Sequence, residues 1–194
     1  MVIGKTFAWA HLPKAGGDAT AAMFRLFPDL VEFQDPVDSD AKHTSFQDRA
    51  ELVAGKRLVL NIRRLPAWVL SRAHHINRHG LAPDYEPLPM DSPHELSESS
   101  FPDYRLSTFT DDGKLEIGVW LRLESLAEDF LSFVSELRDV SEEEHARIGE
   151  LGAVNEGTYD RELSHWFTPA QIRTLYRKNP TWAAIEESLY GNLG

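Results

Sequence analysis

The pattern of apolar and polar positions predicts two strand–turn–helix units in the first part of the chain. Residues 6–12 form an apolar run that enters a glycine-containing loop at residues 13–18, and apolar positions then recur at helical spacing. Residues 57–63 form a second apolar run, and a helix with proline in its first turn is predicted at residues 66–79. Two such units in succession are typical of a parallel sheet with helices on its faces, so we predict an α/β fold.

The rest of the chain is predicted to supply one more strand and a helical C-terminal third. Residues 117–123 form the third apolar run, and a short helix is predicted earlier, at residues 45–54. Capping-box spacing, a serine or threonine three residues before a glutamate or glutamine, marks helix starts at Ser125, Ser141 and Thr168. These helices are expected to cover the sheet.

Residues 81–116 differ from the segments on either side. They contain five prolines and show weak apolar periodicity, so we predict a long loop or lid there. Long loops within compact domains are often functional.

Composition places the chain among ordinary globular proteins. It has 194 residues, of which 42% are hydrophobic and 26% charged, and we predict a single domain covering residues 1–194. The absence of cysteine excludes a disulfide framework, a cysteine zinc site and a thiol nucleophile. No run of 18 apolar residues and no signal-peptide pattern are present, so a cytoplasmic protein without a membrane span is expected.

Charge argues against nucleic-acid binding and is unevenly distributed. The net charge is −11, whereas non-specific nucleic-acid binding requires a basic surface. Residues 1–80 hold 11 basic and 8 acidic residues, a net charge of +3, while residues 81–194 hold 9 and 23, a net charge of −14. The first part of the chain is therefore the better place to look for an anion site.

The loop after the first predicted strand has the chemistry of an anion site. Gly16 and Gly17 permit a tight turn and close approach of a ligand, and the helix that follows offers unpaired N–H groups at its positive end. Lys14 adds a full positive charge. The nucleoside-triphosphate loop, Gly-x-x-x-x-Gly-Lys-Ser/Thr, is absent, and a plain tight turn with a solvent-facing lysine is the alternative.

The end of the second predicted strand adds a second cation. Arg63 lies there, and Ser71 follows eight residues later in the next helix. In doubly wound sheets ligands bind beyond the carboxyl ends of the strands, and an arginine can grip a phosphate in bidentate fashion. Two separated anion positions fit a nucleotide with phosphates at both ends.

Four segments together resemble the sulfotransferase family. Residues 7–17 resemble its 5′-phosphosulfate loop, usually Pro-Lys-x-Ala/Gly-Gly-Thr-Ser/Thr, and residues 62–71 resemble its 3′-phosphate segment, an arginine followed eight residues later by a serine. Residues 120–130 are similar to a later strand–helix piece, and residues 189–191 to the usual terminus. The resemblance implies a nucleotide-kinase-like P-loop sheet and an enzyme that uses 3′-phosphoadenosine-5′-phosphosulfate (PAPS).

The resemblance also implies roles for individual residues. Lys14 would neutralise charge on the leaving phosphate, and Arg63 and Ser71 would hold the 3′-phosphate. The resemblance is loosest at residues 81–116, which we predict to be a long loop or acceptor lid. The implied cofactor-binding residues are Lys14, Ala15, Gly16, Gly17, Asp18, Ala19, Thr20, Arg63 and Ser71. No metal is required. The sulfuryl group would pass to a hydroxyl or amine of a small molecule, sugar or peptide, since the acidic second part of the chain argues against polyanionic acceptors.

The sequence departs from the family pattern at the start of the first helix. Asp18 and Ala19 stand where the family has two hydroxyl residues. Asp18 could turn away from a phosphate and cap its own helix, and Thr20 could supply a hydroxyl one position late. The departure keeps open a non-catalytic, sulfotransferase-like protein that binds a nucleotide or a partner. A phosphotransferase of the related kinase fold is disfavoured by the missing triphosphate loop.

A general base is required to take the proton of the acceptor. His43 is the first candidate because it follows the first helix, where related sequences often place a histidine facing the acceptor, and because histidine titrates near neutral pH. A surface loop histidine is the alternative interpretation. His11, two residues before the loop, is interpreted as structural, and Glu32 and Asp35 are weaker candidates for the base.

Overall fold

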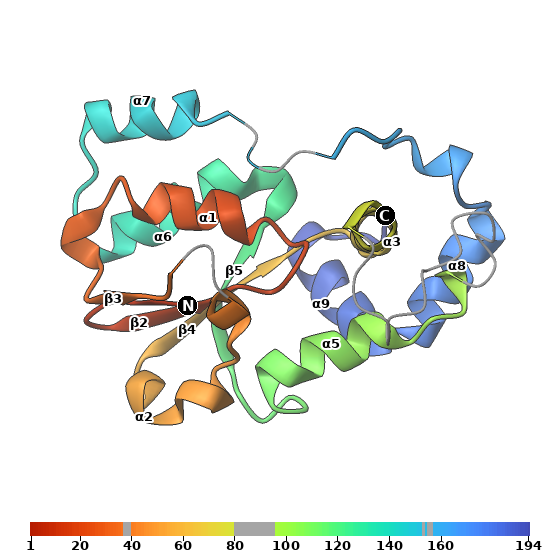
Figure 1. Cartoon of the computed structure of the whole chain (residues 1–194), viewed down its shortest axis with the longest axis horizontal. Coiled ribbons are helices and arrows are strands. Elements are labelled where there is room, and N and C mark those ends of the chain that lie inside the picture. The colour runs from red at the N-terminus through yellow and green to blue at the C-terminus, as the bar shows by residue number, and fades with distance from the viewer. Residues whose placement is uncertain (37–39, 80–95, 153, 155–156) are drawn as a thin grey trace. The chain divides into compact units, whose positions relative to one another are not determined.

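The computed structural model describes most of the chain (Figure 1). Contacts within the chain divide it into two compact units. The described residues are 1–36, 40–79, 96–152, 154 and 157–194. Unit 1 comprises Met1–Ile62 and Ser107–Asn155, and unit 2 comprises Arg63–Leu106 and Glu156–Gly194.

Unit 1 is built on a five-stranded mixed sheet with the strand order β3-β1-β2-β4-β5. The strands are β1 (Val2–Ile3), β2 (Phe7–Ala10), β3 (Phe33–Gln34), β4 (Arg57–Ile62) and β5 (Ile117–Arg122). The three predicted strands are confirmed as β2, β4 and β5, which run parallel to one another. The prediction of a wholly parallel sheet is wrong, because β1 pairs antiparallel with both β2 and β3. Two-residue strands are too short to show the alternation by which a strand is predicted.

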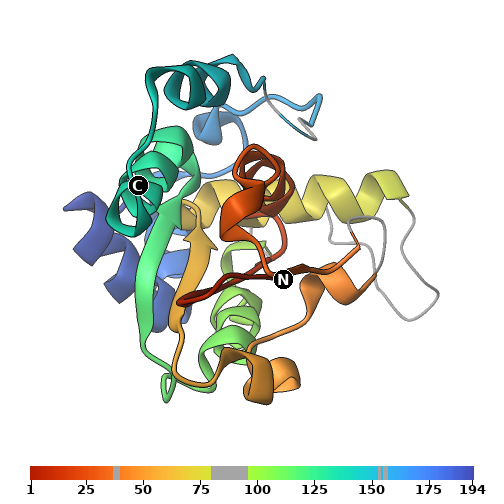
Figure 2. The same cartoon turned by 90° about the vertical axis from the view of Figure 1, so that its left-hand side faces the viewer.

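Two helices of unit 1 cover one face of this sheet (Figure 2). The helices of the unit are α1 (Gly17–Phe24), α2 (Ala50–Val53), α6 (Leu126–Leu137) and α7 (Glu142–Glu150). Helix α6 packs along β5 and against α1, and Ile148 of α7 completes the apolar cluster beside them. Short 3₁₀ turns at Pro28–Leu30, Asp40–His43, Gln47–Arg49 and Leu123–Ser125 connect these elements.

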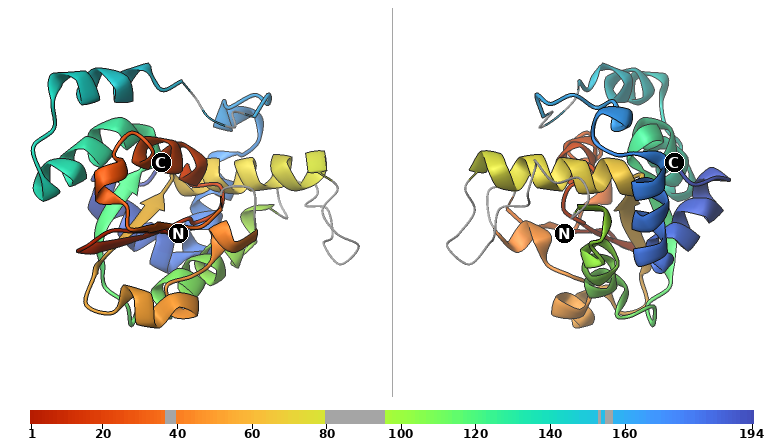
Figure 3. Two further views of the ribbon diagram at one scale, coloured as in Figure 1. Left: turned by 60° about the vertical axis from the view of Figure 1, so that its left-hand side comes forward. Right: turned by 90° about the vertical axis from the view of Figure 1, so that its right-hand side faces the viewer.

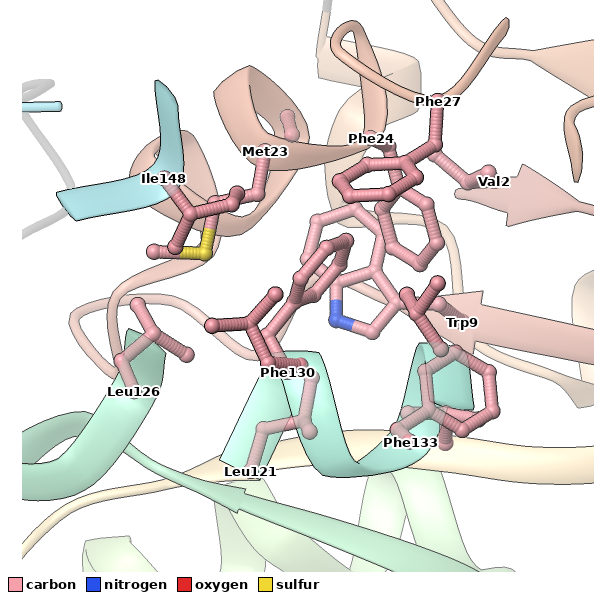
Figure 4. Close-up of a cluster of buried hydrophobic side chains, with 14 of the residues drawn as sticks. Val2, Trp9, Met23, Phe24, Phe27, Leu121, Leu126, Phe130, Phe133 and Ile148 are labelled. Carbon is pink, nitrogen blue, oxygen red and sulfur yellow. The ribbon is translucent and has the colours of Figure 1, made fainter. Parts of the chain in front are cut away.

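The core between α1, α6 and the sheet is largely aromatic (Figure 4). Phe24 of α1 stacks on Phe7 of β2 with ring centroids 5.5 Å apart, and it meets the edge of Phe130 of α6 at 5.0 Å. Phe7 in turn makes a T-shaped contact with Phe133 at 5.1 Å. Such pairs add about 0.5–1.5 kcal/mol each beyond the area that they bury. They fix α1 against β2 and thereby both ends of the loop that joins them.

The described part of unit 2 is mostly helical. Its described helices include α3 (Leu65–His79), α8 (Pro169–Lys178) and α9 (Pro180–Tyr190), together with the first part of α5 (Phe101–Thr110), within which the boundary between the units falls. Helices α3, α8 and α9 pack against one another (Figure 3, yellow and blue). Trp68 and Trp182, both fully buried, form the centre of this packing with ring centroids 5.1 Å apart.

Helix α5 corrects the prediction of an unbroken loop or lid over residues 81–116. Phe101–Thr110 are helical with Pro102 in the first turn, a position that proline tolerates. The Asp103 carboxylate accepts hydrogen bonds from the backbone N–H groups of Thr181 and Trp182, at 2.9 and 2.8 Å, and so caps α9. Residues 80–95, which make up most of the rest of that segment, lie outside the described residues.

The predicted helix starts are correct in position, and two of the three capping boxes form. Ser141 caps α7 and Thr168 caps α8, each with its reciprocal partner three residues later. Ser125 makes no such bond, because Leu123–Ser125 form a 3₁₀ turn that leads directly into α6. There the prediction of a capping box is wrong.

Candidate functional site

The loop between β2 and α1 turns through two residues in the left-handed region. Lys14 has φ of 65° and Gly16 has φ of 95°. That conformation costs an ordinary L-residue roughly 1–2 kcal/mol, so Lys14 is held there by its surroundings. Gly16 requires the absence of a side chain for a second reason, because a Cβ atom would lie 2.6 Å from Leu123 Cδ1. The loop is therefore a fixed structure rather than a loose turn.

Helix α1 begins immediately after this turn, and its N-cap is Gly16. A glycine has no side chain with which to cap the first-turn N–H groups. The interpretation of Asp18 as the N-cap is wrong: Asp18 lies one residue inside the helix, and its carboxylate is 3.3 Å from the Lys42 ammonium. The positive end of α1 thus presents backbone N–H groups beside one paired carboxylate.

Thr20 does not face outward as a hydroxyl for a phosphate. Its side chain is fully buried, and its Oγ1 lies 3.2 Å from the Gly16 carbonyl oxygen and 2.9 Å from Asn61 Nδ2. Asn61 is a fully buried residue of β4, and its Oδ1 accepts a hydrogen bond of 2.7 Å from Trp9 Nε1. The expectation that Thr20 supplies a hydroxyl to a ligand is therefore corrected, since that hydroxyl joins the loop to the sheet.

His11 lies beneath the start of α1. The His11 residue is 5% exposed, and its ring stacks on that of Trp9. The ring also fills the space beside Gly17, because a Cβ atom added to Gly17 would lie 1.9 Å from His11 Cδ2. The pKa of His11 is lowered from 6.5 to about 3, mainly because the ring is buried and secondly because His43 lies nearby. His11 is thus a neutral packing residue near pH 7, which agrees with its interpretation as structural.

His43 is brought to the same loop by the Asp40–His43 turn. Its Nδ1 lies 3.3 Å from the His11 carbonyl oxygen, and the two imidazole rings meet at 4.6 Å in a T-shaped contact. A carbonyl oxygen only accepts, so His43 Nδ1 carries the proton, and the lone pair of the neutral ring is on Nε2. Glu32 and Asp35, the weaker candidates for the base, form ion pairs with Lys56 and Arg49 respectively.

Arg63 and Ser71, the two residues predicted to bind the 3′-phosphate, belong to unit 2. Arg63 directly follows β4 in the chain, and its carbonyl oxygen accepts a hydrogen bond of 3.0 Å from Trp182 Nε1. Its Nε is buried, and within the described residues it has no hydrogen-bond partner. Ser71 lies two turns into α3 and is 8% exposed. A buried guanidinium donor without an acceptor is costly, so Arg63 Nε is a candidate for binding an acceptor atom of a ligand.

The neighbouring Arg64 has a structural role. Its guanidinium is 3.1 Å from the carboxylate of the fully buried Glu186 and lies over the Tyr190 ring. Glu186 also accepts from the backbone N–H of Leu65 at 2.8 Å and from the Tyr176 hydroxyl at 2.7 Å. Burial, followed by the hydrogen bond to Glu186, raises the pKa of Tyr176. The start of α3 is thereby capped by a carboxylate from α9.

Sequence reasoning located the loop but missed the residues that hold it. Lys42 and Asn61 are the two main omissions. Asn61 carries a signal in the sequence, a polar residue within an apolar run that forms a central strand. Lys42 carries none, because its contact with Asp18 depends on how the intervening chain folds back.

Comparison of the chain with models of protein families, with curated proteins and with solved structures finds no match. The structure itself defines the class as α/β, with a five-stranded mixed sheet flanked by helices. Among the residues it describes, no helix has both the length and the apolar character needed to cross a membrane. Function is therefore inferred from the chemistry of the loop, of His43 and of Arg63.

Proposed function

We propose that this protein is a PAPS-dependent sulfotransferase with a nucleotide-kinase-like P-loop fold. The observation that carries the proposal is the loop from Lys14 to Gly17, which turns through two left-handed residues and opens α1 at an N-cap without a side chain. A helix start of this kind binds anions through its N–H groups and its dipole. The sequence resemblance to sulfotransferases assigns the anion as the 5′-phosphosulfate.

The 5′ end of the nucleotide is assigned to unit 1. The N–H groups of Gly16, Gly17 and Asp18 would donate to the 5′-phosphate, and Lys14 would supply the charge. The Asp18 carboxylate would repel this ligand if it stood alone, but Lys42 compensates for it at 3.3 Å. The departure from the two hydroxyls of the family is thus offset by an ion pair rather than left as a bare negative charge.

The 3′-phosphate is assigned to Arg63 and Ser71 of unit 2. The fit rests on the buried Arg63 Nε, which has no partner among the described residues and which a phosphate oxygen would satisfy. The requirement for a phosphate on the 3′ position distinguishes this nucleotide from AMP and from ATP. It is the feature that an experiment can test most directly.

PAPS, when bound, supplies an activated sulfuryl group. The acceptor oxygen or nitrogen forms a bond to sulfur as the bond from sulfur to the bridging oxygen of the 5′-phosphate breaks, and the acceptor loses a proton. His43 is the group proposed to take that proton at Nε2, since its Nδ1 donates to the His11 carbonyl oxygen. Lys14 is proposed to stabilise the negative charge on the leaving phosphate oxygen.

The acceptor is proposed to be a hydroxyl or amine of a small molecule, sugar or peptide. The net charge of −14 over residues 81–194 disfavours heparin-like polyanions, which would meet a surface of the same sign. The chemistry itself requires no metal.

The deciding experiment is a calorimetric titration with adenosine 3′,5′-bisphosphate, with AMP and ATP as controls. We expect micromolar binding that requires the 3′-phosphate and is lost in Arg63→Ala. Arg173→Ala, which removes an exposed arginine from the same unit, is the matched control and should bind as the wild type does. No binding by folded wild-type protein, or equal binding of AMP, would overturn the proposal. Binding without turnover in an acceptor screen would favour the non-catalytic alternative.

A further inference from the structure

Three buried side chains of unit 1 form a hydrogen-bonded chain that ends on the loop. Trp9 of β2 donates from Nε1 to Asn61 Oδ1 at 2.7 Å, and Asn61 of β4 donates from Nδ2 to Thr20 Oγ1 at 2.9 Å. Thr20 of α1 then donates from Oγ1 to the Gly16 carbonyl oxygen at 3.2 Å. The exposed fraction is 2% for Trp9 and 0% for Asn61 and Thr20, so water does not compete for these bonds.

The direction of each bond in this chain is fixed by Trp9. An indole N–H can only donate, so it selects the oxygen of the Asn61 amide and turns the amide nitrogen toward Thr20. The amide nitrogen can only donate, and the Thr20 hydroxyl accepts from it. Although Thr20 Oγ1 also lies 3.2 Å from Asn61 Oδ1, this arrangement leaves its single proton for the Gly16 carbonyl oxygen.

The Gly16 carbonyl oxygen belongs to the same peptide as the Gly17 N–H. It accepts from the backbone N–H of Thr20 at 3.0 Å in addition to the Thr20 hydroxyl. In a planar trans peptide the C=O and N–H bonds point in opposite directions, so a carbonyl held toward the body of α1 directs the Gly17 N–H out of its N-terminal end. The Gly17 N–H therefore points toward the position that an anion would occupy at the start of α1.

A peptide between two glycines is unusually free to rotate as a unit, because neither neighbour has a Cβ atom. Rotation of this peptide would place the Gly16 carbonyl oxygen, with its partial negative charge, where the phosphate is bound. We propose that Asn61 and Thr20 are positioning residues that hold the Gly16–Gly17 peptide with its N–H outward for the 5′-phosphate. This inference rests on the proposed function for its ligand, whereas the orientation of the peptide can be measured without one.

The orientation is tested by the ¹H–¹⁵N residual dipolar coupling of Gly17 in partially aligned protein. Thr20→Val keeps the shape of the side chain and removes its donor, and we expect the Gly17 coupling to change while that of Met23, later in α1, does not. Thr20→Ser keeps the hydroxyl and is expected to restore the wild-type coupling. An unchanged Gly17 coupling in Thr20→Val would overturn the inference, whether or not the protein binds a nucleotide.

Asn61→Asp provides a second variant in case Thr20→Val does not fold. A carboxylate cannot donate a hydrogen bond to Thr20, so the introduced carboxylate would instead accept the Thr20 hydroxyl proton. That proton would then no longer be donated to the Gly16 carbonyl oxygen. The same change in the Gly17 coupling is expected. A wild-type coupling in folded Asn61→Asp would count against the inference.

Calorimetry with adenosine 3′,5′-bisphosphate tests the consequence for binding. Loss of one well-directed hydrogen bond to a charged ligand should weaken binding about tenfold in Thr20→Val. The double variant Thr20→Val/Asn61→Asp should bind no more weakly than Thr20→Val alone, because both changes act through one hydroxyl. If wild type binds and Thr20→Val binds equally, the inference fails and the proposed function stands. If wild type does not bind, the proposed function fails and the Gly17 coupling alone decides the inference.

Discussion

The Asp18 carboxylate and the Lys42 ammonium lie 3.3 Å apart at the first turn of α1. The pair connects the loop to the Asp40–His43 turn, which is joined to the loop a second time through His43 and the His11 carbonyl oxygen. Both partners are partly exposed, with side-chain exposures of 24% for Asp18 and 30% for Lys42, so the pair contributes little to stability. Its effect would be on the charge that the proposed phosphate ligand meets at the positive end of α1.

Lys42→Ala should weaken binding of adenosine 3′,5′-bisphosphate about fivefold, because it removes the ammonium that lies 3.3 Å from the Asp18 carboxylate at the proposed phosphate position. Asp18→Ser should tighten binding and preserve the free energy of unfolding. Calorimetric titration of both variants at low and high salt measures these effects, and the difference should shrink as salt increases. Weaker binding in Asp18→Ser would show that the carboxylate has a positive role.

Lys14→Ala should reduce turnover by roughly 100-fold or more, as expected for the loss of a side chain that stabilises charge in the transition state. Stopped assays of sulfuryl transfer from PAPS to an acceptor found by screening provide the measurement. Lys56→Ala, which removes a lysine of the same unit, is the control. Near-normal turnover in Lys14→Ala would remove this residue from the mechanism.

Gly17→Ala should be destabilising, because the added Cβ would meet the His11 ring at 1.9 Å and a buried ring has little room to move. Overpacking of this kind costs about 1–3 kcal/mol. Urea denaturation measures the loss, and Gly149→Ala is the matched control. Gly149 lies in α7 with nothing within 4 Å of an added Cβ, so alanine there should stabilise by about 0.5–1 kcal/mol. Equal effects at the two positions would contradict the packing described for His11.

The free energy of unfolding should fall as the pH is lowered from 6.5 toward 3. The pKa of His11 is lowered in the folded state to about 3, so in this range the unfolded state binds a proton that the folded state refuses. The slope should approach about 1.4 kcal/mol per pH unit for one proton. Urea denaturation at several pH values measures it. His11→Asn should flatten this slope. The same slope in His11→Asn as in the wild type would contradict the assignment.

The parts of the fold that could be predicted from sequence are those that repeat a pattern over enough residues. Strands β2, β4 and β5 are long apolar runs, and the helices other than α5 either repeat apolar positions or carry a capping sequence. Strands β1 and β3 have two residues each, and no periodicity exists over that length. Helix α5 is not predicted because residues 81–116 contain five prolines and show weak apolar periodicity, although one of these prolines, Pro102, fits the first turn of a helix.

The part of the candidate site formed by residues close together in the sequence could be predicted, whereas contacts between residues far apart in the sequence could not. Lys14, Gly16 and Gly17 lie close together in the sequence, and their spacing alone indicates an anion-binding turn. The partner of Asp18 is 24 residues away and that of Thr20 is 41 residues away, so both contacts depend on tertiary folding. Propensity favours Asp18 as an N-cap, but the N-cap is Gly16, two residues earlier, where the turn requires a glycine.

The carboxylate of Glu186 already occupies the start of α3, where it accepts from the backbone N–H of Leu65. The N–H of Leu65 is therefore already taken and would not be offered to an anion at Arg63. The two ends of the proposed nucleotide would thus differ in tolerance to mutation. The loop would bind its phosphate through several backbone groups that substitution cannot remove, whereas the 3′-phosphate would depend on the side chains of Arg63 and Ser71. One substitution at Arg63 would therefore be enough to abolish the preference, proposed above, for a nucleotide with a 3′-phosphate.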